Sequence, residues 1–314
     1  FAIQQTQRQT QNTKHQTPNT KHQIPNMKEL IVISGKGGTG KTSIIAALAS
    51  LAENKVLCDA DVDAADLHLV ANPQNLSRAE FRSGHTAAIH KGKCTECGLC
   101  RELCRYNAID ADYLINPIDC EGCGVCVYFC PEKAIDFPEN TCGEWFISDT
   151  RFGPLVHARL GIAEENSGKL VTLVRQEAKK LAHKKKHDLI LTDGPPGVGC
   201  PVIASIGGAS AVLIITEPSL SGIHDMQRVI ELANHFKVPA MVCVNKFDLN
   251  PDLTADIEAF AKEEGLIFLG RIPYDPIFIK AMVQGQTIFE YNTQSKAGLA
   301  IRQIWQNLSR RLAL

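Results

Sequence analysis

Glycines and lysines are concentrated in one short loop near the beginning of the sequence. Residues 35–42 read GKGGTGKT and fit the pattern G-x-x-x-x-G-K-[ST]. In such a loop, backbone N–H groups surround phosphate oxygens, the second lysine adds positive charge and the following hydroxyl binds Mg²⁺. The apolar segment 30–34 precedes the loop and the helical segment 43–53 follows it, as the motif requires. We therefore expect a nucleoside triphosphate to bind through Gly35, Lys36, Gly37, Gly38, Thr39, Gly40, Lys41 and Thr42.

Eight of the 12 cysteines form two runs with the same spacing, C-x-x-C-x-x-C-x-x-x-C, at 94–104 and 120–130. This spacing is typical of bacterial ferredoxins with two [4Fe–4S] clusters, in which the last cysteine of each run binds the cluster of the other run. The flanks repeat as well, because CRYNAID at 104–110 is mirrored by CPEKAID at 130–136. The first predicted ligand set is Cys94, Cys97, Cys100 and Cys130, and the second is Cys104, Cys120, Cys123 and Cys126.

Other interpretations of the cysteines remain open. Two C-x-x-C pairs could form a Cys₄ zinc site, although two runs of four fit paired [4Fe–4S] clusters better. Disulfides are typical of secreted proteins, and the sequence shows no charged-then-apolar secretory pattern. Cys58 and Cys243 lie in apolar segments and are expected to be small core residues. Spacing alone assigns no role to Cys142 or Cys200.

Short apolar segments alternate with helical segments along most of the sequence. Segment 30–34, LIVIS, is continuously apolar, as expected for a strand buried on both faces of a parallel sheet. This alternation predicts an α/β fold with a mostly parallel sheet covered by helices. The expected strands are 30–34, 55–61, 188–194, 211–218, 240–248 and 266–273, and the expected helices are 43–53, 169–187, 221–236, 252–264, 276–284 and 296–312.

The segment that carries the eight cysteines interrupts this alternation. Residues 83–141 are rich in Cys, Gly and Asp, and we interpret them as a small α+β ferredoxin-like domain inserted after the second strand. Residues 27–82 and 142–314 would then form one P-loop domain. Residues 1–26 are almost entirely Gln, Thr, Asn, Lys, His and Pro, so we expect a disordered tail or extension, with Met27 as the natural start.

The loop sequence KGGTGKT resembles the signature KGGxGKT of the deviant Walker-A ATPases, the MinD/ParA/Mrp family. The resemblance extends over most of residues 27–314 outside the insertion, and it includes the acidic elements DAD at 59–61 and DGPPG at 193–197. It implies a P-loop NTPase fold and dimerisation on ATP, with Lys36 reaching the nucleotide of the partner subunit. Phosphoryl transfer depends mainly on positioning and charge neutralisation. The resemblance implies that Lys36, Lys41 and Asp61 are catalytic and that Thr42, Asp59 and Asp193 hold Mg²⁺.

A polar loop, NKFD at 245–248, follows one of the expected strands. In the resembled family the corresponding asparagine contacts adenine, and a second loop, here IPYD at 272–275, lies beside the base. This implies that Asn245, Lys246 and Pro273 bind the nucleotide. The same segment also resembles the guanine-reading NKxD of GTPases, so GTP is the alternative to ATP.

Cys200 lies seven residues after Asp193. In the nitrogenase iron protein, a relative of the resembled family, a cysteine at this offset ligates a cluster shared by two subunits. The resemblance therefore makes Cys200 a candidate interface cysteine, and a buried cysteine at a helix start is the alternative. A shared cluster needs a second cysteine from each subunit, and Cys142 is the nearby candidate.

These motifs together favour a Mg–ATP-dependent, dimerising ATPase that carries two [4Fe–4S] clusters. The preferred function is ATP-coupled electron transfer from the clusters to a partner protein. The first alternative is assembly or delivery of iron–sulfur clusters or metal centres, as in Mrp-type carriers. The second alternative is a MinD/ParA-like positioning switch in which the clusters have a structural or sensing role.

Charge and hydropathy limit the expected partners and location. The formal net charge of −1 at pH 7 gives no reason to expect a nucleic-acid partner. No apolar stretch approaches the roughly 18 residues of a membrane span. We expect a cytoplasmic protein whose partners are a second copy and a redox or cluster-accepting protein. One apolar face of the helix at 296–312 is expected to close the fold, and membrane association through this helix, as in MinD, is the alternative.

Overall fold

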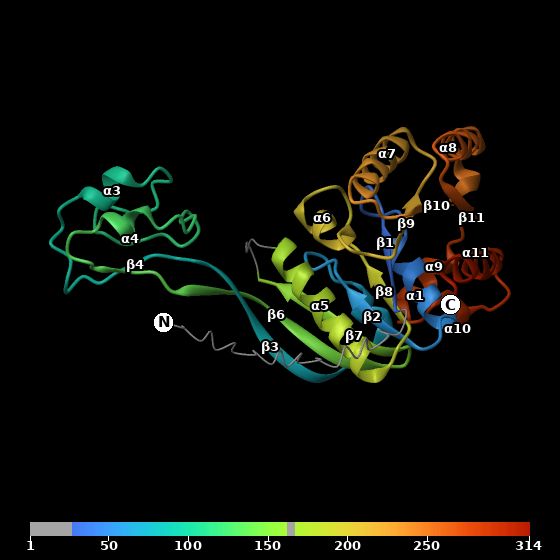
Figure 1. Ribbon diagram of the computed structural model, residues 1–314, viewed down its shortest axis with the longest axis horizontal. Helices are drawn as coiled ribbons and strands as arrows, with labels where there is room; N and C mark the ends of the chain where they lie inside the picture. The colour runs from blue at the N-terminus through green and yellow to red at the C-terminus, as the bar shows by residue number, and fades with distance from the viewer. Residues whose placement is uncertain (1–26, 162–166) are drawn as a thin grey trace, which may run out of the picture.

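A nine-stranded β-sheet organises most of the chain (Figure 1). The computed structural model describes residues 27–161 and 167–314, so the predicted tail at 1–26 lies outside the described residues. The strand order is β11-β10-β9-β1-β8-β2-β7-β6-β3. The strands are β1 (Lys28–Ile33), β2 (Lys55–Asp59), β3 (Gln74–His85), β6 (Glu139–Thr150), β7 (Gly153–Leu160), β8 (Leu189–Asp193), β9 (Ala211–Thr216), β10 (Ala240–Asn245) and β11 (Ile267–Ile272).

The strands from β11 to β7 pair in parallel, and helices cover both faces of this part of the sheet. Successive side chains of a strand point to opposite faces, so Leu30 and Val32 of β1 enter one core while Ile31 and Ile33 enter another. The predicted α/β fold with a mostly parallel sheet is confirmed. On the Leu30 face lie α1 (Lys41–Leu51), α2 (Leu67–Ala71), α9 (Ile277–Val283), α10 (Ile288–Tyr291) and α11 (Lys296–Leu312), and on the opposite face lie α5 (Ser167–Lys185), α6 (Cys200–Ile206), α7 (Leu220–His235) and α8 (Pro251–Glu263).

The antiparallel strands β3 and β6 complete one edge of the sheet and then extend away from it as a two-stranded ribbon (Figure 1). At the far end of this ribbon lie residues 86–138, which we call the cysteine-bearing end. The insertion does not leave directly from the second strand, because α2 and β3 come between β2 and the cysteines. Both β3 and β6 run without interruption through positions 83 and 141, where the predicted domain boundaries lie. The division into domains therefore stays a prediction.

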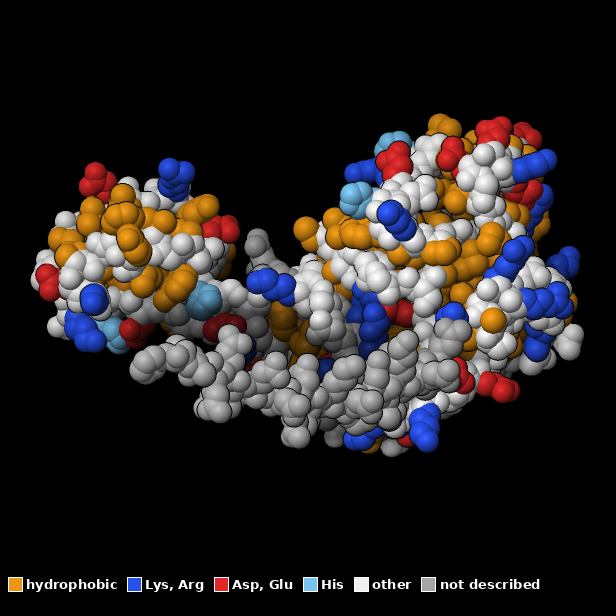
Figure 2. Space-filling view, viewed as in Figure 1, with side chains coloured by type: hydrophobic (Ala, Val, Ile, Leu, Met, Phe, Trp, Pro, Cys, Tyr) orange, Lys and Arg blue, Asp and Glu red, His pale blue; other side chains and the backbone are white. Residues whose placement is uncertain are grey.

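The cysteine-bearing end contains little regular structure. It consists of the short antiparallel strands β4 (Ala88–Ile89) and β5 (Ile135–Asp136), the helices α3 (Leu99–Leu103) and α4 (Val125–Phe129), and connecting turns. Hydrophobic side chains cover much of the face of this end seen in Figure 2. In this end of the chain Tyr106, Ile118 and Tyr128 are exposed, and neither short helix buries a residue fully.

The C-terminal helix α11 closes the core on the α1 side of the sheet. Its apolar face, with Ile301, Ile304, Leu308 and Leu312, is buried against β11 and α1. This burial supports the packing role predicted for the helix over the membrane-binding alternative. Among the described helices, none combines the length and apolar character needed to cross a membrane.

Candidate functional site

The candidate site lies at the carboxyl ends of the parallel strands. The loop between β1 and α1 turns at Gly38 and Gly40, whose φ angles of 80° and 86° lie in the region that favours glycine. A Cβ atom on Gly40 would lie 2.6 Å from Asn245 Nδ2, at the end of β10. This amide donates a hydrogen bond to the carbonyl of Thr39 at 2.7 Å. The fold therefore ties the predicted base-side residue Asn245 directly to the glycine-rich loop.

Lys41 is buried among carboxylates contributed by two other strands. Its ammonium forms an ion pair with Asp193, at the end of β8, and another with Asp61, which follows β2, at 3.4 Å. Burial lowers the pKa of Lys41, but Asp193, Asp61 and Asp59 together outweigh this effect and raise it. Without a nucleotide, the lysine is therefore charged and held by the acidic groups predicted to serve catalysis.

Asp59 and Asp61 differ in their surroundings although they are two residues apart. Asp59 is fully buried, and its carboxylate accepts hydrogen bonds from the backbone N–H groups of Asp61 at 3.1 Å and Leu67 at 3.3 Å. Burial and the neighbouring Asp193 raise the pKa of Asp59 well above its usual value. Burial also raises the pKa of Asp61, to about 6, although Lys41 opposes this shift.

The oxygen atoms around Lys41 fit the binding of Mg²⁺. Among the described residues, Asp193 Oδ2 and Thr39 Oγ1 are buried without a hydrogen-bond partner. Buried polar atoms normally have partners, so the unpaired oxygen of Asp193, whose other oxygen contacts Lys41, marks a place prepared for a ligand. Thr42, the second residue of α1, directly follows Lys41, and Asp59 supplies a further carboxylate. Carboxylate and hydroxyl oxygens suit this hard cation.

A cavity on the base side of the loop contains about 630 Å³ of empty space and is open to solvent. It brings together Gly38, Gly40, Asn245, Lys246 and Pro273, the predicted nucleotide-binding residues from three loops. Its remaining wall is mostly apolar, as expected for a site that holds a planar base. The lining is completed by Ser43, Tyr274, Asp275, Phe278, Ile279 and Met282.

Asp248, the residue that would read guanine in an NKxD motif, forms a contact within the protein. Its carboxylate accepts a hydrogen bond at 2.6 Å from the backbone N–H of Tyr274, in the loop after β11. Asp248 therefore holds the second base-side loop against the first. This contact supports the adenine interpretation over the guanine alternative, because one oxygen of the carboxylate already has a partner.

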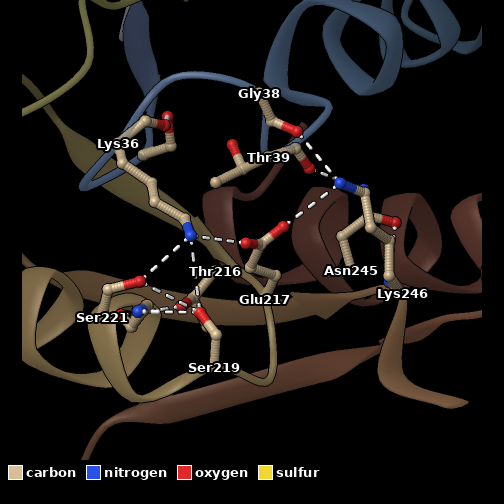
Figure 3. A network of polar contacts seen from close by, with 11 residues as sticks. Lys36, Gly38, Thr39, Thr216, Glu217, Ser219, Ser221, Asn245 and Lys246 are labelled. Carbon is tan, nitrogen blue, oxygen red and sulfur yellow. Dashed lines mark hydrogen bonds and ion pairs between the residues drawn. The ribbon is translucent and has the colours of Figure 1, made fainter. Parts of the chain in front are cut away.

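Lys36 takes part in a polar network that sequence reasoning did not find (Figure 3). Its ammonium lies 2.6 Å from Glu217, immediately after β9, and donates hydrogen bonds to Ser221 at 3.1 Å and Ser219 at 3.5 Å. The neighbouring Gly35 packs so closely on Asp225 of α7 that an added Cβ would lie 2.3 Å from Asp225 Cβ. One feature of the sequence could have pointed to this network. Glu217 is an acidic residue at the end of an apolar segment, as Asp59 and Asp193 are.

Comparison with known proteins agrees with this geometry. The model of the family described as "CobQ/CobB/MinD/ParA nucleotide binding domain" matches residues 30–288. The chain belongs to this family. Membership confirms the family resemblance of the P-loop and the expectation of a nucleotide-binding domain.

Similar proteins match nearly the whole chain. The sequence is 34% identical over 283 residues to the protein named "Uncharacterized protein MJ0578" of Methanocaldococcus jannaschii, covering 89% of this chain and 96% of that protein. It is 26% identical over 293 residues to the septum site-determining protein MinD of Synechocystis, covering 90% and 88%. The solved structure of MinD with Mg-ADP from Pyrococcus horikoshii has a TM-score of 0.57 and 17% identity, covering 91% of this chain and 97% of that one. This structural likeness shows the same fold.

The cysteine-bearing end contains two further cavities. One cavity there is lined by the first predicted ligand set, Cys94, Cys97, Cys100 and Cys130, and a second cavity is lined by the other set, Cys104, Cys120, Cys123 and Cys126. Burial and the neighbouring Cys120 raise the pKa of the Cys126 thiol to about 11. Within residues 27–161 and 167–314, no group of three or more His, Cys, Asp or Glu side chains is arranged around a single metal-ion position. Cluster ligation by these cysteines therefore stays a prediction.

The remaining cysteines lie in different environments. Cys58 and Cys243 are buried in the cores, where burial raises the pKa of Cys243 to about 12. Cys200 is exposed and is the first residue of α6, so the alternative of a buried residue is wrong. Cys142 is buried in β6, and its thiol donates a hydrogen bond to the carbonyl of Ser83 at 2.8 Å. A role for Cys200 at an interface stays a prediction.

Proposed function

We propose that this chain is a Mg²⁺-dependent ATPase that dimerises on binding ATP and couples the nucleotide to one-electron transfer from its cysteine-bearing end. The observation that carries the proposal is the correspondence between the two predicted cysteine sets and two separate cavities. Family membership supports the nucleotide-binding half. We place the protein in the cytoplasm, where ATP is available and thiols stay reduced.

The proposed hydrolysis uses the residues around Lys41. Asp61 orients the attacking water, whose oxygen bonds to the γ-phosphorus and whose proton passes to a γ-phosphate oxygen, while the bond from that phosphorus to the β–γ bridging oxygen breaks. Lys41 exchanges its carboxylate partners for the β- and γ-phosphate oxygens and neutralises their charge. Asp193, Asp59 and Thr42 would hold the Mg²⁺, which supplies further charge neutralisation when bound. The products are ADP and phosphate.

The donor set at the cysteine-bearing end fits paired [4Fe–4S] clusters better than a single zinc ion. Four thiols surround each cavity, and each set takes its fourth cysteine from the other run, as this cluster type requires. When bound, the clusters would supply one-electron redox chemistry, with electrons received from a low-potential donor protein and passed to an acceptor protein. The chain itself contributes the thiolates and the apolar lining from residues such as Ile109 and Ile135.

A continuous stretch of chain connects the two halves. The buried carboxylate of Asp59 accepts a hydrogen bond from the N–H of Leu67, the first residue of α2. Helix α2 is followed within three residues by β3, which forms the ribbon leading to the cysteines. A change at Asp59 on nucleotide binding is therefore transmitted to the start of the ribbon through one helix.

The first experiment tests the ATPase and its metal content. We expect anaerobically purified protein to contain about eight iron atoms and eight sulfides per chain and little zinc. Cys94→Ser and Cys120→Ser together should remove the brown absorbance of thiolate-bound iron. Lys41→Ala should abolish ATP hydrolysis and ATP-dependent dimerisation while retaining the iron. Zinc in place of iron, or ATP turnover that survives Lys41→Ala, would contradict the proposal.

The second experiment separates electron transfer from cluster delivery and from positioning. Dithionite-reduced protein is mixed with a viologen dye of higher potential, with and without Mg–ATP, and dye reduction is followed by stopped-flow absorbance. Electron transfer predicts that ATP changes the rate in the wild type, that Lys41→Ala shows no such change and that iron stays on the chain. Iron appearing on an added apo-ferredoxin would favour a carrier. ATP-dependent binding to lipid vesicles without any rate change would favour a positioning switch.

A further inference from the structure

Two lysines from distant parts of the sequence share one carboxylate at the edge of the nucleotide site (Figure 3). Glu217 Oε1 lies 2.6 Å from Lys36 Nζ, and Glu217 Oε2 lies 3.1 Å from Lys246 Nζ. Lys246 also donates a hydrogen bond to the carbonyl of Gly38 at 3.0 Å. Glu217 is thus in contact with the glycine-rich loop through Lys36 and with the base-side cavity through Lys246.

The three groups are partly shielded from solvent. Glu217 is 19% exposed, Lys246 25% and Lys36 34%. Partial burial raises the pKa of Glu217, but hydrogen bonds from Lys36 and Lys246 outweigh this effect and lower it below the usual value. The carboxylate is therefore charged at neutral pH and holds two ammonium groups.

Lys36 uses its donors within its own subunit. Its ammonium contacts Glu217, Ser221 and Ser219, all of them in or beside the turn between β9 and α7. An ammonium has three N–H donors, so these contacts occupy all of them. Lys36 must leave this turn before it can bind any group on another molecule.

The second lysine, Lys246, lowers the electrostatic cost of separating Lys36 from Glu217. Removing the only cation beside a partly buried carboxylate destabilises the protein, because the negative charge is left unpaired. Glu217 would still be neutralised by Lys246 after Lys36 has left, so no unpaired charge remains. The arrangement of one carboxylate between two lysines therefore suits the release of one of them.

We propose that Glu217 is a positioning residue that holds Lys36 on its own subunit until the nucleotide-bound dimer forms, and that Lys246 neutralises Glu217 when Lys36 leaves. This inference rests on the proposed function, because it gives the released Lys36 a destination at the partner's nucleotide. There the lysine exchanges one carboxylate for phosphate oxygens. The strength of the Lys36–Glu217 pair then sets how readily the dimer forms.

The turn that carries Glu217 does not depend on its side chain. Ser219 Oγ accepts a hydrogen bond from the N–H of Gly222 at 3.0 Å and caps α7. Thr216 Oγ1 donates to the carbonyl of Gly222 at 3.0 Å, and the N–H of Ser219 donates to the carbonyl of Glu217 at 2.8 Å. We therefore expect Glu217→Gln to fold normally and to change only the charge at this position.

The first test measures Lys36 in the nucleotide-free protein. The full chain is treated briefly with acetic anhydride, and acetylation of Lys36 is quantified by mass spectrometry. Glu217→Gln should acetylate Lys36 about threefold to fivefold faster, because the ammonium is no longer held by a carboxylate. Glu217→Asp should restore slow labelling at least in part. Equal labelling in the wild type and Glu217→Gln would overturn the inference whatever the oligomeric state.

The second test measures dimerisation by sedimentation velocity at saturating Mg²⁺ and non-hydrolysable ATP analogue. Glu217→Gln should lower the dimer Kd about threefold to fivefold. Lys246→Met should raise it, because the release of Lys36 then leaves Glu217 unpaired. Glu217→Gln combined with Lys246→Met should return to the Glu217→Gln value.

The two proposals fail in different ways. A wild-type chain that stays monomeric with the ATP analogue contradicts the proposed function, while the acetylation result still decides the Lys36–Glu217 contact. A wild-type chain that dimerises, with a Kd unchanged by Glu217→Gln, contradicts the role proposed for Glu217 and leaves the ATPase proposal intact.

Discussion

The nucleotide site and the cysteine-bearing end are built in opposite ways. The nucleotide site stands on strands such as β1, β8 and β9, whose residues are nearly all buried. Its glycine-rich loop accepts hydrogen bonds from the side chains of Asn245, at the end of β10, and of Lys246, the next residue. The cysteine-bearing end, which the structure describes throughout, buries only five hydrophobic side chains. These are Ala87, Ala108, Ile109, Ala134 and Ile135, and three of them are alanines.

This difference indicates what each region needs in order to be folded. A parallel sheet with covered faces buries enough apolar surface to form without its ligand. Five small or medium side chains do not offset the conformational entropy of about fifty residues. Small domains of this kind are commonly stabilised by metal centres, whose binding free energy becomes folding free energy. We infer that the nucleotide site is prepared by the fold, whereas the cysteine-bearing end depends on what it binds.

The largest expected effect is therefore the response to iron removal. If the cysteine-bearing end holds the proposed clusters, treating the anaerobic protein with a chelator should accelerate amide hydrogen exchange in residues 94–130 by about a thousandfold or more, since local folding free energy is lost with the metal. Exchange in β1, β8 and β9 should not change. Hydrogen exchange with mass spectrometry measures both regions in one sample.

Adding back iron and sulfide provides the control, and it should restore slow exchange in residues 94–130. If these residues stay protected in the iron-free chain, the apolar contacts there suffice for folding. The inference that the cysteine-bearing end, unlike the nucleotide site, needs its ligand in order to fold would then be wrong.

A smaller effect is expected from removing a charge inside the prepared site. Lys41→Ala leaves the carboxylates of Asp193 and Asp61 without their cation and should lower the free energy of unfolding by about 3 kcal/mol. Urea denaturation of the nucleotide-free and Mg²⁺-free protein measures this loss. Lys36→Ala is the matched control from the same loop, because its pair with Glu217 is more exposed and should contribute less than about 1 kcal/mol. Equal losses would contradict the difference in burial.

The two regions also differ in how much the sequence reveals. The glycine-rich loop and the paired cysteine runs could be predicted because their chemistry is encoded in short spacings. The parallel strands β1, β2, β8, β9, β10 and β11 could be predicted because continuous apolar segments mark them. The parallel strand β7 was missed, since His157 and Arg159 interrupt its apolar residues. The ribbon strands β3 and β6 could not be predicted. Most residues of β3 face solvent and show no apolar run, and β6, which is mostly half-buried, has only the short apolar run 145–147.

Contacts between segments that are distant in the sequence could not be predicted, for a different reason. Glu217 lies 181 residues after Lys36, and nothing in either segment specifies the other. Their contact follows from the neighbouring positions of β1 and β9 in the sheet. The same holds for Asp248 and Tyr274, which come into contact because the fold brings the two base-side loops together.

The smallest expected effect concerns a buried histidine where the ribbon joins the sheet. His157 of β7 stacks on Phe146 of β6, and its Nε2 lies 3.0 Å from the hydroxyl of Ser148. Burial and the nearby His68 lower the pKa of His157 to about 4. Because the unfolded chain binds this proton below about pH 6.5 and the folded chain does not, acidification between these values reduces stability.

His157→Gln should therefore flatten the pH dependence of stability between about pH 6.5 and 4, by at most about 1.4 kcal/mol per pH unit. Urea denaturation at several pH values measures the difference from the wild type, which isolates His157 from carboxylates such as Asp61 that titrate nearby. The exposed His224→Gln is the control and should follow the wild-type curve. A His157→Gln curve that runs parallel to the wild type would mean that His157 takes up its proton as readily in the folded chain as in the unfolded one. The junction of ribbon and sheet would then behave like the solvent-exposed cysteine-bearing end and not like the buried sheet to which it is joined.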